Sequence, residues 1–262
     1  MSPRRSSNSP DGADMSGERP LAAVILAAGE GTRMKSDLAK VLHRVGGVPM
    51  IRHVVAAVRG VCPERIVAVV GHQADAVMRE LEGEGLEFAL QRERLGTGHA
   101  VMQTRPLLDG FDGTLIVLTG DTPLLRAGTL ASLVEYHRSR GASATVLSAV
   151  LDDATGYGRI VRDTAGDLLR IVEHKDASEQ ELLIREINSG IFCFEREDLF
   201  TALERVDRRN VQGEYYLTDV MEILRRSGRR TAVHQCPDPG EVMGVNDLEQ
   251  LAQAERILGG DG

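Results

Sequence analysis

The chain has 262 residues, 42% of them hydrophobic and 27% charged, a composition typical of a globular protein with a large core. Its formal net charge of −8 argues against nonspecific binding to nucleic acid or to an anionic membrane, because both partners select a basic surface. The three cysteines are widely spaced and form no CxxC pair, so they indicate neither a disulfide framework nor a zinc site and favour the cytoplasm.

The first 20 residues differ in composition from the rest of the chain. They are rich in Ser, Pro, Gly and charge and lack the apolar core of a signal peptide, which predicts a disordered tail over residues 1–20. No later apolar run approaches the roughly 20 residues of a membrane span. We therefore expect a single folded domain over residues 21–258.

The first half of this domain alternates short apolar runs with helical periodicity, the pattern of a parallel sheet covered by helices. Helices are predicted over residues 49–61, from residue 95 onward, and where Leu130, Leu133, Val134 and His137 share one face. Strands are predicted over residues 21–28, 65–71, 86–90 and 114–121.

The second half contains more closely spaced and more polar strand patterns, over residues 143–150, 158–163, 168–174 and 186–194. They predict that the parallel core acquires a mixed or antiparallel edge. Helices are expected over residues 196–203 and 216–226, then a strand over 231–236 and a last helix from about residue 247. The predicted fold class is α/β, Rossmann-like, with a mostly parallel sheet flanked by helices and a mixed or antiparallel portion.

Three glycine turns follow strands or precede helices, at residues 29–33, 95–98 and 119–121. Ligands of open α/β sheets bind at the carboxyl ends of strands, so these turns predict one crevice, although glycines also simply end strands. Gly29 and Gly31 would let backbone N–H groups approach a phosphate. A dinucleotide fingerprint and a P-loop both fail here, because Met34 occupies the position where each needs a glycine.

The lysines point to the same loop. The chain has 28 arginines and three lysines, and two of the lysines, Lys35 and Lys40, lie close behind the first glycine turn. The ammonium group is a compact point charge that suits a phosphate. This distribution predicts a polyphosphate site.

The string LAAGEGTRM followed by Lys40 resembles the signature of the sugar-1-phosphate nucleotidyltransferases. The strings LGTGHA, TGYGRI, IVEHKDA, EINSGI, QGEYYLTD and GVN, in this order, resemble the uridyltransferase domain of the bacterial bifunctional N-acetylglucosamine-1-phosphate uridyltransferases. The resemblance runs from about Leu21 to Leu258. It implies the nucleotide-diphospho-sugar transferase fold, with a nucleotide-binding half over residues 21–140 and a sugar-binding half over 141–258.

The resemblance also implies an enzyme that forms UDP-N-acetylglucosamine and pyrophosphate from UTP and N-acetylglucosamine 1-phosphate, a reaction that supplies peptidoglycan and other cell-wall glycans. The attacking sugar phosphate is already an anion, so catalysis is mainly alignment and charge neutralisation. Arg33 and Lys40 are the cations implied as catalytic, against the alternative of a solvated charged loop. Lys35 is interpreted as a surface residue.

For the uracil, the resemblance implies the backbone of a strand end together with an amide that can pair with an imide edge. Taken alone, Gln91 is only a polar residue after a strand. The implied nucleotide-binding residues are Leu26, Ala27, Ala28, Gly29, Gln91, Gly96 and Thr97.

The implied cofactor is Mg²⁺, held by Asp121 and Asn246, since this ion prefers a few hard oxygens plus phosphate and water. Asp121 could also be a simple turn residue. Asn246 could instead form a capping box with Glu249, unless Asp247 caps the last helix and leaves Asn246 to the metal.

For the sugar, the resemblance implies a glycine backbone, a carboxylate, an amide and hydroxyl groups. Each of these residues alone also fits a structural role, and Lys175 could face the sugar phosphate or simply pair with a carboxylate. The implied sugar-binding residues are Gly158, Glu173, Asn188, Tyr216 and Thr218.

Two departures from the resemblance matter. Ala39 stands where proline usually precedes the lysine, which predicts a more flexible loop before Lys40. The hexapeptide repeats of an acetyltransferase β-helix do not follow Leu258, so we expect no acetyltransferase activity, and the oligomeric state is left undetermined. The alternatives are the same chemistry on another sugar, such as glucose 1-phosphate, and a noncatalytic nucleotide-sugar sensor.

Overall fold

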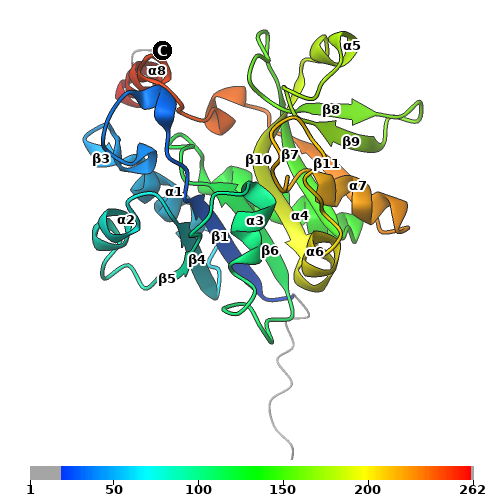
Figure 1. Cartoon of the computed structure of the whole chain (residues 1–262), viewed down its shortest axis with the longest axis horizontal. Helices are drawn as coiled ribbons and strands as arrows, with labels where there is room; N and C mark the ends of the chain where they lie inside the picture. Colours follow the sequence, from blue (N-terminus) through cyan, green and yellow to red (C-terminus); the bar gives the residue numbers. More distant parts are fainter. Residues whose placement is uncertain (1–18, 261–262) are drawn as a thin grey trace, which may run out of the picture.

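The computed structural model describes residues 19–260, and a twisted central sheet runs through it with helices on both sides (Figure 1). The predicted tail therefore lies outside the described residues, except for Arg19 and Pro20. The seven strands along the main path of the sheet are β1 Leu21–Ala27, β4 Arg65–Val70, β5 Glu87–Leu90, β6 Thr114–Thr119, β7 Ala144–Val150, β10 Glu186–Glu195 and β11 Thr231–Gln235.

The strand order is β11-β7-β10-β6-β1-β4-β5, and every neighbouring pair is parallel except those that involve β10. The predicted mostly parallel α/β sheet is confirmed. The expected mixed or antiparallel portion in the second half is confirmed, because β10 runs antiparallel to both β6 and β7. This reversed strand lies inside the sheet, and parallel β11 forms the edge. Sequence spacing indicated a reversal but carried no information on where the strand inserts.

A hairpin of β8 Arg159–Arg162 and β9 Leu168–Val172 extends from the sheet beside β10, followed by the short helix α5 Glu179–Leu182 (Figure 1). A second, two-stranded sheet pairs β2 Arg44–Val45 with β3 Val48–Pro49. Neither this small sheet nor α5 was expected from the sequence, because both are shorter than the periodicity that reveals an element.

The other helices are α1 Met50–Arg59, α2 Ala74–Glu80, α3 Thr97–Met102, α4 Ala127–Arg140, α6 Arg196–Leu203, α7 Asp219–Arg226 and α8 Leu248–Gly259. Three 3₁₀ turns are η1 Thr32–Met34, η2 Lys40–Leu42 and η3 Pro239–Val242. The predicted apolar face of α4 is confirmed, since Leu130, Leu133, Val134 and His137 are all buried.

Two apolar cores lie on opposite faces of the sheet. Alternate residues of β1 point to opposite sides. Ile25 belongs to the core that includes residues of α1, α2 and α4, whereas Val24 belongs to the core that includes residues of α3, α6 and α7. Both faces of the parallel strands are covered, which explains why their sequences are apolar without alternation. Within residues 19–260, none of the helices is both apolar and long enough to cross a membrane.

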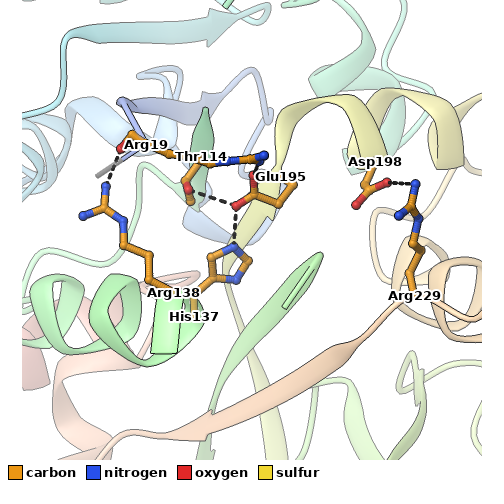
Figure 2. Close-up of polar contacts among 7 residues, drawn as sticks. All are labelled: Arg19, Thr114, His137, Arg138, Glu195, Asp198 and Arg229. Atoms are coloured by element: carbon orange, nitrogen blue, oxygen red, sulfur yellow. Dashed lines mark hydrogen bonds and ion pairs between the residues drawn. The ribbon is translucent and has the colours of Figure 1, made fainter. Parts of the chain in front are cut away.

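A polar cluster closes the amino-terminal end of the sheet (Figure 2). Glu195 Oε1 accepts hydrogen bonds from Thr114 Oγ1 and is paired with His137 Nε2, each at 3.1 Å, while Oε2 forms an ion pair with Arg19. Burial opposes ionisation of Glu195, but these three donors outweigh it and lower its pKa to about 2. The cluster ties β6, β10 and α4 together at the end where β1 begins.

Candidate active site

The glycine loop after β1 is shaped by Gly31, which packs directly on Lys40. Gly31 has φ of +66°, a left-handed conformation that other residues rarely adopt. A Cβ atom on Gly31 would lie only 2.5 Å from Lys40 Cβ, whereas one on Gly29 would have nothing within 4 Å. The loop therefore needs a glycine at Gly31 to close on Lys40, and Gly29 leaves open space beside its backbone.

The Lys40 ammonium joins three segments that are distant in sequence. Its Nζ forms an ion pair with the Asp121 carboxylate and donates a hydrogen bond to Asn246 Oδ1 at 3.0 Å. The Asn246 segment is held against the end of β6 because the Val245 N–H donates to the Asp121 carbonyl oxygen at 2.8 Å. Burial opposes ionisation of Asp121, but Lys40 outweighs it and lowers the pKa of this carboxyl.

The cap of α8 is Asp247, whose side chain accepts a hydrogen bond from the Gln250 N–H at 2.9 Å. The alternative capping box between Asn246 and Glu249 does not form. Asn246 instead directs Oδ1 to Lys40, while its Nδ2 donates to the Gly244 carbonyl oxygen. Asn246 thus has an oxygen to offer a cation.

Two oxygens, from Asp121 and Asn246, already converge on one cationic group, which is the donor chemistry a divalent metal needs. Among residues 19–260 there is no group of three or more His, Cys, Asp or Glu side chains that could hold a metal. Mg²⁺, however, commonly takes one or two protein oxygens and completes its coordination with water and substrate phosphates. The residues present fit such an open site.

A cavity of about 430 Å³ lies beside the glycine loop, and Lys40 and Asp121 are part of its wall. The amide of Gln91 is held in a fixed orientation there, because its Nε2 donates to the Gly96 carbonyl oxygen at 3.1 Å. All seven residues predicted to bind the nucleotide line this cavity: Leu26, Ala27, Ala28, Gly29, Gln91, Gly96 and Thr97.

A second cavity, of about 220 Å³, adjoins the first, and Asp121 lines both. Arg33, an exposed residue of η1, lies on its wall together with Asn246. Four of the five residues predicted to bind the sugar also line it: Gly158, Glu173, Asn188 and Thr218.

Two of these side chains are held by neighbours. Thr218 Oγ1 donates to Glu173 Oε1 at 2.9 Å, and burial raises the pKa of this carboxyl in spite of that bond. Asn188 lies where β10 bulges, and its Oδ1 accepts a hydrogen bond from the Gly190 N–H at 2.9 Å. The bulge interrupts the strand and presents several of its residues to the cavity.

Tyr216 is placed differently from the other predicted sugar residues. Its hydroxyl donates to Asp176 Oδ2 at 3.0 Å and accepts from Gln212 Nε2 at 2.9 Å, and the linings of the two cavities do not include it. Lys175 is exposed, and its Nζ donates to Gln212 Oε1 at 2.8 Å. Lys35 is exposed, as expected.

Several wall residues were not predicted. Arg94 and Glu214 line the first cavity, Tyr157 and Gly244 line the second, and Thr119 lines both. Tyr157, Glu214 and Gly244 lie inside the strings TGYGRI, QGEYYLTD and GVN, so those strings were the available signal. Arg94 had none, because an arginine in a polar loop is ordinary.

The family of the chain follows from its similarity to known proteins. Residues 23–210 match the MobA-like NTP transferase domain. The chain belongs to this family. The strand order and the position of the site at the carboxyl ends of β1 and β6 agree with a nucleotidyltransferase fold.

Within this family, the resemblance to the uridyltransferase domain is confirmed. The chain is 55% identical over 236 residues to the bifunctional protein GlmU of Enterococcus faecalis and 57% identical over 236 residues to that of Brevibacillus brevis. Each match covers 90% of this chain but only 51% of the relative, so the chain spans about half the length of these relatives.

The solved structure of a UDP-glucose pyrophosphorylase complexed with UDP-glucose superposes with a TM-score of 0.73 and covers 93% of this chain and 100% of that one. Its sequence identity is 16%, so the likeness establishes the fold alone. The predicted nucleotide-diphospho-sugar transferase fold is thereby confirmed.

Proposed function

We propose that this protein transfers a uridyl group from UTP to N-acetylglucosamine 1-phosphate, forming UDP-N-acetylglucosamine and pyrophosphate. The observation that carries the proposal is the pair of adjoining cavities with Lys40, Asp121 and Asn246 at their junction. Transfer of a uridyl group between two phosphorylated substrates needs two neighbouring pockets, with positive charge where the phosphates meet. The similarity to the GlmU proteins supports this choice of substrates.

The first cavity suits a uridine nucleotide. The backbone of Leu26 to Gly29 and the oriented Gln91 amide offer donors and acceptors for an imide edge. A base that presents the wrong pattern would leave buried polar groups unpaired, which gives strong discrimination. The open space at Gly29 leaves room for the triphosphate beside the loop.

The second cavity suits a sugar with hydroxyl and amide substituents. The Glu173 carboxyl after β9, the Thr218 hydroxyl before α7 and the Asn188 amide of β10 line one small space. We assign the residues before about 140 to nucleotide binding and those after to sugar binding, which places the reacting groups at the boundary.

In the proposed reaction, an oxygen of the sugar phosphate attacks the α-phosphorus of UTP, and the bond from this phosphorus to the pyrophosphate oxygen breaks. The attacking oxygen is already ionised, so no general base is required. Lys40 and Arg33 would hold the phosphates in line and neutralise charge as it develops. The ammonium of Lys40 is well placed for this, because Gly31 packs against its side chain.

We further propose a magnesium ion as cofactor, with Asp121 and Asn246 as its protein ligands. When bound, it would neutralise phosphate charge and orient the triphosphate. The proposal also assigns the enzyme to the cytoplasm, a reducing compartment suited to its three free cysteines.

The proposal is tested with purified protein, UTP, Mg²⁺ and a panel of sugar 1-phosphates, with pyrophosphate release as the readout. We expect N-acetylglucosamine 1-phosphate to react fastest and the Lys40→Met variant to serve as the inactive control. Equal rates with glucose 1-phosphate would contradict the assigned sugar.

A second assay, the exchange of labelled pyrophosphate into UTP, distinguishes an enzyme from a sensor. A sensor would bind UDP-N-acetylglucosamine but would not exchange labelled pyrophosphate into UTP. We expect exchange to occur, because the cationic and oxygen-bearing groups of a working site are all present at the junction.

A further inference from the structure

The loop that leads to Lys40 is held by a side chain from another part of the chain. Gln73, which follows β4, accepts a hydrogen bond from the Ala39 N–H through Oε1 at 2.9 Å. Its Nε2 donates to the Asp37 carbonyl oxygen. One amide side chain therefore restrains two backbone groups immediately before Lys40.

The backbone of Gln73 is itself unusual. Its φ and ψ are +50° and +41°, a left-handed conformation that is uncommon for residues other than glycine, asparagine and aspartate. It lies at the position before the first residue of α2, and its carbonyl oxygen accepts from the Ala76 N–H at 2.9 Å. A residue in such a conformation persists where the surrounding structure holds it in place.

Ala39, whose N–H is bound by Gln73, has a backbone conformation that its own side chain does not enforce. Ala39 is 1% exposed and has ψ of 133° and φ of −52°, and this φ lies within the range that the proline ring fixes covalently. Alanine does not fix φ, so the flexibility expected from this residue must be opposed by contacts. The hydrogen bond from the Ala39 N–H to Gln73 provides one that proline could not make, since proline has no N–H.

We propose that Gln73 is a positioning residue for Lys40: its amide clamps Asp37 and Ala39 so that η2 starts with the lysine directed at the junction of the two cavities. The consequence for activity rests on the proposed uridyl transfer. The clamp itself does not, and it is measured separately.

The first measurement is hydrogen exchange of the Leu42 amide, without nucleotide or metal. This N–H donates to the Ala39 carbonyl oxygen at 2.9 Å and so reports whether the turn is closed. Gln73→Gly removes the clamp and suits the left-handed backbone, so the fold is not put at risk. We expect exchange about fivefold faster, from the loss of hydrogen bonds worth roughly 1 kcal/mol.

The second measurement is steady-state kinetics. Gln73→Gly should lower kcat about fivefold, from the same loss of order, with little change in KM for the sugar phosphate. Asp75→Ala, an exposed substitution in the first turn of α2, is the matched control and should change neither kcat nor Leu42 exchange.

Two further variants separate positioning from general stability. Ala39→Pro in the Gln73→Gly background should restore slow Leu42 exchange and most of kcat, because the ring replaces the clamp. In a Lys40→Met background, Gln73→Gly should lower the residual rate no further, because Gln73 acts through the lysine.

Unchanged Leu42 exchange in Gln73→Gly would overturn the clamp. Faster exchange with unchanged kcat, failure of Ala39→Pro to rescue, or additive loss in the Lys40→Met background would overturn the positioning role. Absence of uridyl transfer by the unmodified protein would instead overturn the proposed function, and the exchange arm would still decide on the clamp.

Discussion

Two polar clusters lie at opposite ends of the same sheet, and both pair a carboxylate with a cation. At the amino-terminal end, both oxygens of Glu195 are taken by protein donors, from Thr114, His137 and Arg19. At the carboxyl-terminal end, Asp121 shares a single ammonium with Asn246 at the meeting point of two cavities. The first arrangement is complete in the protein alone, whereas a ligand can exchange partners in the second.

The two clusters show how a charged pair that stabilises the fold differs from one that is available to a ligand. Both carboxyls have lowered pKa values, and a cavity of about 540 Å³ lies beside Glu195 as well, so neither property distinguishes them. The difference is that Asp121 lies where two cavities meet and shares its cation with Asn246, whereas both Glu195 oxygens pair with protein groups. The clusters should therefore respond oppositely to substitution, one losing stability and the other losing activity.

The largest expected effect is on turnover. Lys40→Met should lower kcat by about 100-fold or more, because removal of one preorganised donor costs roughly 3 kcal/mol at the transition state. Pyrophosphate release measures it. Near-normal turnover would show that the site does not depend on this ammonium and would remove the distinction between the clusters.

Next is the metal dependence. Asp121→Asn should raise the Mg²⁺ concentration for half-maximal activity at least tenfold, since even outer partners of metal ligands contribute this much to affinity. The measurement is a Mg²⁺ titration at saturating UTP, with Asp198→Asn as the control carboxylate. An unchanged titration would count against Asp121 as a ligand.

At the other cluster, Glu195→Gln should leave kcat within about twofold and lower the free energy of unfolding by roughly 1–2 kcal/mol near neutral pH, because solvent screens the ion pair with the exposed Arg19. The direction follows from the pKa of Glu195, which is lowered from 4.5 to about 2. Urea denaturation measures it. Asp198→Asn, in an ion pair with exposed Arg229 (Figure 2), should cost less than about 1 kcal/mol.

The contribution of Glu195 to the free energy of unfolding should decrease in acid. Because the pKa of Glu195 is lower in the folded state, the unfolded state takes up the proton first as the pH falls. The stabilisation is complete above about pH 5 and is lost as the pH falls towards about 2. The Glu195→Gln variant should lack this part of the decline, and equal slopes in both proteins would contradict the assignment.

The smallest effects are expected from alanine substitutions of the two glycines in the loop after β1. Gly31→Ala introduces a side chain at φ of +66° and 2.5 Å from Lys40 Cβ, so it should destabilise the fold by roughly 1–2 kcal/mol and lower kcat. Gly29→Ala meets open space and should leave the unfolding free energy within about 0.5 kcal/mol. Similar destabilisation by both would mean that the loop is not closed on the lysine.

The sequence predicted one end of the sheet better than the other. Apolar runs that end at glycines and Asp121 revealed the strand ends, and all the residues predicted to bind nucleotide or sugar, except Tyr216, line the two cavities. His137 was correctly predicted on the buried face of α4 but was assigned no partner. The carboxylate that pairs with His137 belongs to Glu195 of β10. This strand is distant in sequence and comes next to α4 only in the folded chain, so no local pattern could reveal the pair.

Tyr216 and Gln73 show the same limit from two sides. A motif placed Tyr216 among the sugar residues, but its hydroxyl is bonded to Asp176 and Gln212. Gln73 has no motif and no periodic signal, yet its side chain reaches the loop before Lys40. Sequence patterns identify which segments meet, and the direction of a single side chain depends on packing that only the folded chain provides.

The reversed strand β10 connects the two ends of the molecule. Its Asn188 bulge borders the second cavity, and Glu195 at its other end belongs to the amino-terminal polar cluster, about seven residues or roughly 23 Å away. A slip of one residue would turn every side chain of the strand to the opposite face, withdrawing Asn188 and breaking the Glu195 contacts together. A single register of β10 against β6 and β7 therefore satisfies both ends of the strand. A chain paired in another register would lose stability at one end and the proposed substrate contacts at the other.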